Sequence, residues 1–301
     1  MMQLPTKNNI QNKMNVLVSY AYMRKYKEAD TTWMFNIPGV SFLLDCGAFS
    51  AMNSGVDIVL ADYITYIKKW KHKLCGYVAL DKIGDPKQTD INLNIMLKAG
   101  LKPIPVHVRG DGKARMDDLF KISPWVALGG LKRPGRGSCS PEYVKQKMDW
   151  AAGRNVHWFG YTNLNMVAAF KPYSCDSSAI TGSRRWGNTW MYKDAHTPPL
   201  LYTYDEFIKA KIPLWVRELI EEAGYTYEEM LERPMWHGIR QPAAFISNAS
   251  YIRYAADMER ILGTKYFIVT VATVMNELFL AYNNVYDVPY CAQENIPKSF
   301  T

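Results

Sequence analysis

The chain has 301 residues, of which 48% are hydrophobic and 21% are charged, and this composition excludes a largely disordered protein. Its formal net charge of +8 favours polyanionic partners such as nucleic acids, although charge alone does not establish one. The five cysteines form no CxxC or CxC pair, which argues against a zinc site built on clustered cysteines. Scattered cysteines of odd number are typical of reduced thiols in a cytoplasm.

The beginning of the sequence is polar. Residues 1–15 contain no apolar segment of the kind that a secretory signal requires. No stretch of the chain approaches the uninterrupted apolar length that a membrane-spanning helix needs. We therefore expect a cytoplasmic protein without a membrane partner.

Short apolar runs alternate with helical stretches through the first two thirds of the chain. The runs predicted to be strands are 15–20, 41–45, 76–81, 103–108, 125–128, 156–160 and 172–176. Several are almost uninterrupted apolar sequence, which is typical of strands covered on both faces. A later β-rich run, KYFIVTV at 265–271, is predicted to be the final strand.

The stretches between these runs have helical spacing and helix end signals. The predicted helices are 57–69, 89–99, 141–152 and 163–170. Ser140 is the expected N-cap of the third helix, with Pro141 at its first position. Alternating strands and helices imply parallel strands with crossover helices, and seven such units before residue 177 favour a (β/α)8 TIM-like barrel over an open sheet.

The sequence changes character after residue 194. An irregular, proline-containing stretch is followed by predicted helices at 209–223, 226–231 and 250–262. We divide the chain into three parts on this basis. They are a barrel core at 1–194, a helical insertion or lid at 195–263, and a final strand with the C-terminal segment at 264–301.

Three acids each follow directly on an apolar run. Asp45 ends the run LLD, Asp81 ends YVALD, and Asp176 ends PYSCD. In TIM-like barrels the chemistry lies at the carboxyl ends of the strands, so the three carboxylates are expected to meet in one pocket. Each acid alone is equally explained as a turn or capping residue, because Asp is common at strand ends.

Glycines accompany two of these strand ends. Gly47 lies two residues after Asp45, where a missing side chain lets a flat ligand approach the backbone. Gly129 and Gly130 follow the predicted strand 125–128 and expose backbone amide donors.

Other candidate side chains flank further strand ends. His107 is a lone histidine, more often structural than catalytic, and Arg109 either holds a phosphate or substrate carbonyl or pairs with Asp111. Phe49 and Tyr161 are the candidates for stacking on a base. Trp158 is expected in the core.

The order of these motifs resembles that of the tRNA-guanine transglycosylase superfamily. The motifs are LLDCGAFS, YVALD, PVHVRG, ALGGLK and FGYTNLNMVAAFKPYSCDSS. They look closest to the short phage and bacterial members that insert 7-deazaguanines into DNA. The resemblance implies a (β/α)8 barrel, in agreement with the strand count, and exchange of guanine through a covalent glycosyl-aspartate.

The resemblance also implies roles for the matching residues. Asp176 matches the nucleophile, and Asp45, with Cys46 in place of the usual Ser, matches the acid that contacts the base and shuttles protons. Asp81 matches the acid that reads the pyrimidine edge of guanine.

The remaining matches concern the binding of the base. Gly129, Gly130 and Leu131 match a Gly-Gly-Leu that donates a backbone amide to the base. Arg109 stands where the family has Gln, and this departure leaves recognition there open. His107 is kept as a further substrate-binding candidate, and Phe49 or Tyr161 is expected to cover the ring.

Two departures from the family pattern favour DNA over tRNA as the substrate. The tRNA enzymes carry a zinc site of three Cys and one His near the C-terminus, whereas residues 180–301 contain only Cys291, His196 and His237. The run SSAITGSRRWGN after the matched nucleophile also differs from that of the tRNA enzymes. We therefore expect no metal and no cofactor, and a 7-deazaguanine as the small-molecule substrate.

A target base has to leave the duplex stack to reach a barrel mouth. Four basic residues are expected to hold the flanking phosphates: Arg133, Arg136, Arg184 and Arg185. Three alternatives remain open: a tRNA-directed enzyme of the same chemistry, a nucleoside or glycoside hydrolase that uses water as acceptor, and a non-catalytic nucleic-acid-binding barrel. For a phage-encoded chain the expected location is the host cytoplasm.

Overall fold

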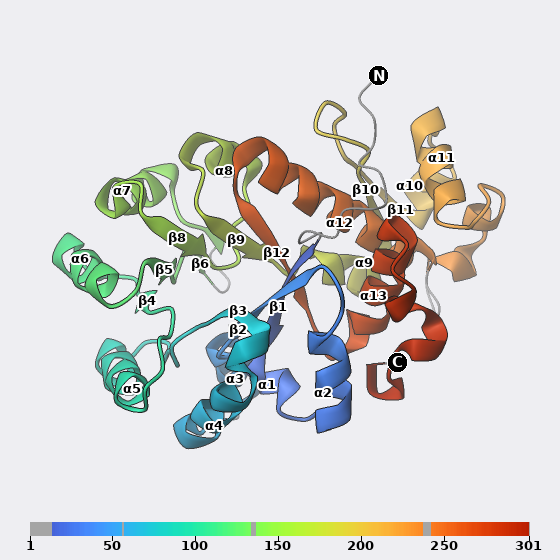
Figure 1. The fold of residues 1–301 in the computed structure, drawn as a ribbon. Coiled ribbons are helices and arrows are strands. Elements are labelled where there is room, and N and C mark those ends of the chain that lie inside the picture. Colours follow the sequence, from blue (N-terminus) through green and yellow to red (C-terminus); the bar gives the residue numbers. More distant parts are fainter. Residues whose placement is uncertain (1–13, 56, 134–136, 237–241, 301) are drawn as a thin grey trace.

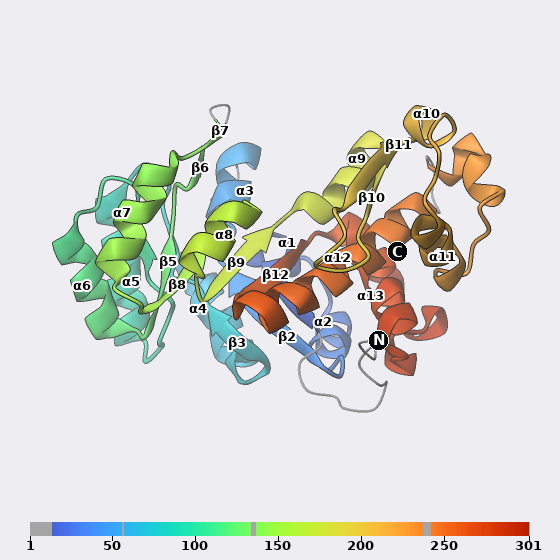
Figure 2. The ribbon, with the colours of Figure 1, turned by 90° about the horizontal axis from the view of Figure 1, so that it is seen from above.

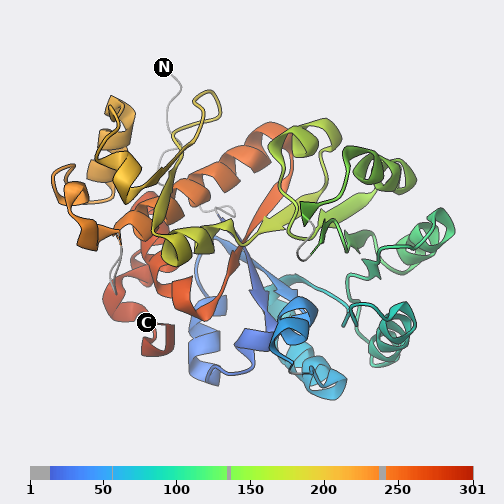
Figure 3. The same cartoon turned by 180° about the vertical axis from the view of Figure 1, so that it is seen from behind.

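The computed structural model describes residues 14–55, 57–133, 137–236 and 242–300. Its centre is a curled sheet of eight parallel strands surrounded by helices (Figures 1 and 3). In spatial order the strands are β3 (Leu74–Tyr77), β2 (Val40–Asp45), β1 (Met14–Ser19), β12 (Lys265–Thr270), β9 (Ser174–Ser177), β8 (Asn155–Trp158), β5 (Trp125–Leu128) and β4 (Val106–His107).

The two outermost strands of this sheet meet and close it. A parallel bridge joins Val78, just after β3, to Ile104, just before β4. The N–H of Ile104 donates to the carbonyl of Tyr77, and the N–H of Ala79 donates to the carbonyl of Ile104, both at 2.8 Å. Each strand thus lies beside the strands that precede and follow it along the chain, and the predicted (β/α)8 TIM-like fold is confirmed.

All eight predicted strands are present, but β3 and β4 are shorter than expected. β3 ends at Tyr77 and not at residue 81, and β4 has only two residues. Pro103 and Pro105 flank Ile104, and neither can donate a ladder hydrogen bond. The regular ladder between these strands is therefore reduced to the single bridge that closes the barrel.

A helix follows each strand and covers the outside of the barrel (Figure 1). The main covering helices are α2 (Glu28–Phe35), α4 (Leu60–Trp70), α5 (Pro86–Lys98), α6 (Lys113–Ile122), α7 (Pro141–Ala151), α8 (Leu164–Phe170), α12 (Pro242–Leu262) and α13 (Ala272–Tyr286). α7 begins as predicted, because the hydroxyl of Ser140 accepts the N–H of Tyr143 and Pro141 occupies the first position. In the described ranges no helix combines the length and the apolar character that crossing a bilayer requires.

Three of these helices were not predicted from the sequence: α2, α6 and α13. α2, EADTTWMF, is short and buries only Thr31, Met34 and Phe35. α6, KARMDDLFKI, buries only Met116 and Leu119, so its apolar stripe is too narrow to stand out. α13, ATVMNELFLAYNNVY, follows the last strand directly, and its many apolar and β-branched residues hide the helical period.

The interior of the barrel is filled by apolar side chains from successive strands. The buried members of this cluster are Leu17, Leu43, Val78, Ile104, Val106, Ala127 and Phe267. Side chains alternate between the two faces of a strand, so Asp45, two residues after Leu43, points to the same interior. Asp176 pairs with Phe267 in the β9–β12 ladder and shares its direction. Parity therefore directs both acids into the mouth of the barrel.

An inserted segment lies between β9 and α12, to one side of the barrel (Figure 1). It contains an antiparallel hairpin of β10 (Asn188–Met191) and β11 (Leu200–Thr203), which crosses the predicted boundary at residue 194. The helices α10 (Tyr204–Phe207) and α11 (Leu214–Glu222) pack with it around a separate buried cluster that includes Trp236. α12 packs along β12 and α13, so this helix of the predicted insertion belongs to the barrel wall.

Candidate active site

The three acids lie at or just beyond the carboxyl ends of strands of the same sheet, and the charges of Asp81 and Asp176 act on the pKa of Asp45. Burial is the main reason why the pKa of Asp45 is raised from 3.8 to about 6. The negative charges of Asp176 and Asp81 add to this rise, while the N–H of Gly47 opposes it. The structure thus brings together three carboxylates that are 36 or more residues apart in sequence, as the strand-end pattern predicts.

Asp45 is held by the turn that follows it. Its Oδ2 accepts the N–H of Gly47 at 2.9 Å, and Gly47 has a φ of +86°, which favours glycine. A Cβ on Gly47 would lie 2.7 Å from the Cβ of Ala21 and from the Oγ of Ser19. The missing side chain therefore makes room for the segment after β1, and the expectation that it admits a flat ligand is corrected.

Asp81 is anchored to α5. The Oγ1 of Thr89 donates to Oδ1 of Asp81 at 2.8 Å, and the Nδ2 of Asn92 donates to the carbonyl of Leu80 at 3.0 Å. Thr89 and Asn92 are three residues apart and so lie on the same face of the helix. Burial raises the pKa of Asp81, and the hydroxyl of Thr89 partly offsets the rise.

A cavity of about 620 Å³ opens beside Asp81. Its lining includes Met52 of α3 (Ala48–Ser54) and Asn92 of α5. An ion pair of 2.8 Å between Lys82 and Asp57 lies at its edge. Of the three acids, Asp81 alone belongs to the described lining, so the cavity extends outward from Asp81 and does not enclose all three. Its volume suits a base or nucleoside.

Asp176 is only 7% exposed, and hydrogen bonds hold one of its carboxylate oxygens in place. Its Oδ1 lies 3.1 Å from Nε2 of His157 and accepts the N–H of Gly160 at 3.0 Å. The Nδ1 of His157 lies 2.8 Å from Oγ of Ser174. His157 and Ser174 were not among the predicted site residues, although counting back by twos from Phe159 and Asp176 places both side chains inside the barrel.

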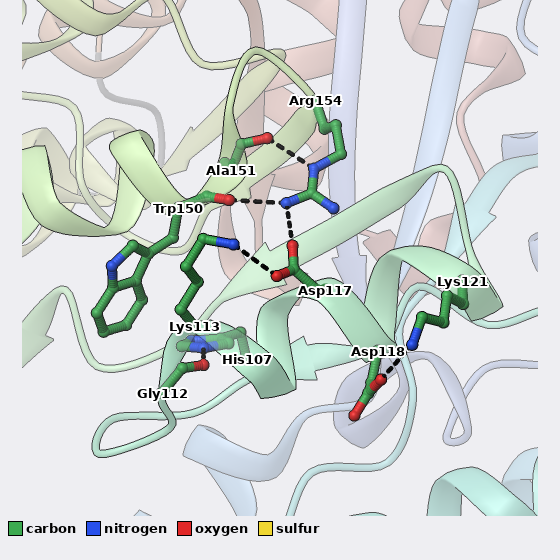
Figure 4. A network of polar contacts seen from close by, with 9 residues as sticks. All are labelled: His107, Gly112, Lys113, Asp117, Asp118, Lys121, Trp150, Ala151 and Arg154. Carbon is green, nitrogen blue, oxygen red and sulfur yellow. Dashed lines mark hydrogen bonds and ion pairs between the residues drawn. The ribbon is translucent and has the colours of Figure 1, made fainter.

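His107 lies in the wall of the barrel and not in its mouth. Its neighbours Val106 and Val108 point inward, so its own side chain points outward against Trp150 of α7 (Figure 4). Nε2 donates to the carbonyl of Gly112 at 3.2 Å. Burial lowers the pKa of His107, as does the nearby charge of Lys147. The expected substrate contact from His107 is corrected to a structural one.

Arg109 and Gly130 face each other at the mouth. Arg109 is exposed, and its guanidinium lies over the ring of Tyr143, 5.6 Å from the centroid. Asp111 accepts the N–H of Val108 at 2.9 Å and so holds the turn. The alternative in which Arg109 pairs with Asp111 is not seen among the described contacts. Gly130 has a φ of +73°, and a Cβ there would lie 2.9 Å from the Cβ of Arg109.

The glycine pair continues into a fixed turn. The N–H of Gly129 donates to the carbonyl of His107 at 3.0 Å, and the N–H of Cys139 donates to the carbonyl of Leu131 at 2.8 Å. Leu131 itself is fully buried, so its contribution to the mouth is that of its backbone.

The two candidate stacking residues have different environments. Phe49 on α3 is 54% exposed, whereas Tyr161 is 4% exposed and packs edge-on against Trp158, with the ring centroids 5.5 Å apart. Tyr161 is therefore part of the core in this structure, and Phe49 presents a ring to solvent. Trp158 is buried as predicted.

The four arginines expected to hold phosphates, here called the basic rim, are only partly described. Arg136 and the side chains of Arg133 and Arg184 lie outside the described residues, whereas Arg185 is exposed on α9 (Gly182–Trp186). Beside it Trp186 is 73% exposed. Figure 2 shows α9, α3 and the hairpin of β6 (Lys132–Arg133) and β7 (Gly137–Ser138) on the same side of the molecule.

Comparisons with other proteins identify no family for this chain, so its site is interpreted from its geometry. No protein-family model matches the chain, and no curated protein matches it significantly. Within the described ranges, no group of three His, Cys, Asp or Glu side chains is arranged to hold a metal ion. The arrangement offers Asp176 with one oxygen held by hydrogen bonds, Asp45 with its pKa raised to about 6, and Asp81 beside a cavity.

Gly47 gives a prediction about stability. Gly47→Ala is expected to lower the free energy of unfolding by more than about 2 kcal/mol, because it adds a steric clash to an unfavourable φ. Gly55→Ala is the matched control, since Gly55 also has a positive φ of +67° but open space around it, and it should lose only about 1–2 kcal/mol. Equal losses in urea denaturation would contradict the close packing.

Asp45 gives a prediction about pH. Because its folded pKa is raised, the ionised carboxylate destabilises the fold above about pH 6, and this penalty disappears below about pH 4. Asp45→Asn should therefore stabilise the protein at pH 8, by up to about 3 kcal/mol, and bring no gain at pH 4.

Asp117→Asn is the control of opposite sign. Hydrogen bonds from Lys113 and Arg154 lower the pKa of Asp117 (Figure 4), so its loss should destabilise the protein at pH 8 and matter less in acid. Thermal unfolding of both variants across this pH range checks the signs. A destabilised Asp45→Asn at pH 8 would contradict the burial argument.

Proposed function

We propose that this protein is a base-exchanging transglycosylase, similar to the tRNA-guanine transglycosylase superfamily, that replaces guanine in DNA with a 7-deazaguanine. The observation that carries the proposal is the contrast between two neighbouring carboxyls at the barrel mouth. Asp176 is fixed by donors on one oxygen, while Asp45 has a pKa of about 6. Carboxyl groups in such different environments suit a nucleophile and a proton carrier.

The first half of the reaction releases guanine. A carboxylate oxygen of Asp176 attacks C1′ of the flipped nucleotide, forming a C–O bond as the C1′–N9 bond breaks. The electron pair of that bond leaves with N9 of guanine. Asp45, protonated in a substantial fraction of molecules near pH 6, supplies the proton that N9 takes up.

The second half reverses these steps with a different base. The carboxylate of Asp45 accepts the proton from N9 of the incoming 7-deazaguanine, and N9 attacks C1′. The ester bond breaks, and its electron pair returns to Asp176. Neither half requires a metal or redox cofactor in this scheme, because the two carboxyls supply nucleophile and proton.

Recognition of the base is assigned to Asp81, which lines the cavity, and to groups outside the described lining. Asp81 accepts hydrogen bonds from the N–H groups of the guanine edge, and Thr89 fixes the orientation of its carboxyl. Gly130 offers a backbone N–H to the base carbonyl, and Phe49 offers an exposed ring. Arg109, next to Gly130, is assigned the substrate contact that the glutamine makes in the similar family.

The decisive test is base exchange in a purified system. DNA and tRNA are each incubated with the protein and an isotopically labelled guanine or 7-deazaguanine, and digested nucleosides are measured by mass spectrometry. We expect label in DNA, and Asp176→Asn should reduce the rate by at least about 1,000-fold because the nucleophile is removed. Asp118→Asn, on the exposed face of α6, is the matched control and should leave the rate unchanged.

Each other outcome points to one of the alternatives. Label only in tRNA would identify the tRNA-directed enzyme, and free guanine without incorporation would identify a hydrolase. Binding without either reaction would indicate a non-catalytic barrel. Full exchange by Asp176→Asn would show that Asp176 is not the nucleophile.

The rim gives a further prediction. If Arg185 contacts a phosphate, Arg185→Gln should weaken DNA binding and reduce the slope of log affinity against log salt by about one unit. Arg260→Gln, in the last turn of α12 and paired with Asp257, is the control far from the mouth and should not change the slope. An unchanged slope of log affinity against log salt in Arg185→Gln would show that Arg185 does not contact a DNA phosphate.

A further inference from the structure

His157 is a buried polar residue beneath the nucleophile that the scheme above does not use. It lies on β8, is 1% exposed, and its ring contacts the side chains of two other residues through both nitrogens. Nε2 is 3.1 Å from Oδ1 of Asp176, and Nδ1 is 2.8 Å from Oγ of Ser174. Buried histidines often only satisfy a structural contact, but here one contact is made to the reacting carboxylate itself.

The partners of the ring determine which nitrogen carries the proton. An ionised carboxylate only accepts hydrogen bonds, so Nε2 has to carry the proton that is shared with Asp176. Nδ1 of a neutral ring then accepts the hydroxyl proton of Ser174, because a hydroxyl both donates and accepts. Ser174 is fully buried and adjacent in the barrel, so its hydroxyl is placed to pair with Nδ1, while the carboxylate of Asp176 selects the tautomer.

The ring is also held mechanically. It meets Phe159, Phe267 and Trp125 edge-on, with centroid distances of 4.8, 6.0 and 6.2 Å. Phe159 and Trp125 pack against the interior cluster to which Phe267 belongs, so they confine the imidazole on several sides. A donor confined in this way holds its acceptor in one orientation.

The two oxygens of Asp176 consequently have different environments. Within the described part of the chain, both hydrogen bonds to the carboxylate, from His157 and from the N–H of Gly160, go to Oδ1. Oδ2 receives neither. An oxygen without strong donors keeps its electron density and is the better nucleophile of the two.

We propose that His157 is a positioning residue that, together with the N–H of Gly160, holds Oδ1 of Asp176 and leaves Oδ2 to form the bond to C1′. This inference rests on the proposed function. In the first step Oδ2 gains the C1′ bond, C1′ loses its bond to the departing base, and Oδ1 becomes the carbonyl oxygen of the ester.

The same two donors then act on the return step. They polarise the ester carbonyl at Oδ1, and they stabilise the negative charge that returns to the carboxylate when the Oδ2–C1′ bond breaks. His157 neither gains nor loses a proton in this cycle. Its effect is therefore expected on the rate of exchange and not on the affinity for nucleic acid.

Three variants test this assignment by kinetics. His157→Leu removes the donor and should lower kcat by about 10- to 100-fold, with KM for DNA changed less than about threefold. His157→Gln places an amide nitrogen at the position of Nε2 and should keep kcat within about tenfold of the unchanged protein. Ser174→Ala keeps the contact to Asp176 and should have the smallest effect.

Exchange by His157→Leu at the full rate would overturn the proposal. So would equal losses in His157→Leu and His157→Gln, because they would show that ring packing, and not the donor, matters. Thermal unfolding of each variant identifies any that fails to fold.

A second measurement needs neither activity nor a folded variant at position 157. Two-bond ¹H–¹⁵N correlation spectra of the five imidazole rings report which ring nitrogens are protonated. We expect a protonated Nε2 on His157, with a resonance that shifts in Asp176→Ala. An unprotonated Nε2, or a resonance that Asp176→Ala leaves unchanged, overturns the inference.

The two failures can be told apart. If the protein exchanges no base in DNA or tRNA, the proposed function fails, and the spectra alone decide whether His157 donates to Asp176. If the protein exchanges bases and the variants at position 157 behave like the unchanged protein, only the role of His157 fails.

Discussion

Closure of eight parallel strands into one ring is the constraint on which the rest of this structure depends. Once the bridge between Val78 and Ile104 joins the edges, every strand has an inside and an outside, and alternate residues are committed to one or the other. The inside fills with Leu43, Phe267 and their neighbours. At the carboxyl ends the filling stops, and the same inward positions carry polar groups.

Those polar groups are placed at some cost in stability. The carboxyl of Asp45 is buried near two other acids, which raises its pKa to about 6, so its ionised form opposes folding at neutral pH. A barrel selected only for stability has no need of such a cluster. Strained electrostatics of this kind are common at functional sites, because a group that titrates near neutral pH both gives and takes protons readily.

The fold by itself does not name a reaction, since TIM-like barrels host many. The reaction types that fit this site are narrowed by the different environments of the three acids. Asp176 has one oxygen held by His157 and Gly160, Asp45 is bound through the N–H of its own turn, and Asp81 is tied to α5 beside a cavity. The proposed reaction assigns the roles of nucleophile, proton carrier and base-reading acid to these three different environments, which lie at three separate strand ends.

The sequence by itself determined the strands, five of the eight helices that cover the barrel, the barrel and the three acids, because apolar runs, caps and strand-end positions are local signals. Tertiary structure decided where the neighbouring side chains point. His107 faces outward, Tyr161 joins the core, and Gly47 makes room for Ala21, whereas His157 comes to lie under Asp176. Strand parity assigns alternate residues to opposite faces, but register and the packing of segments distant in sequence decide which face lies inside. Neither of these can be read from composition or from the residues adjacent in the chain.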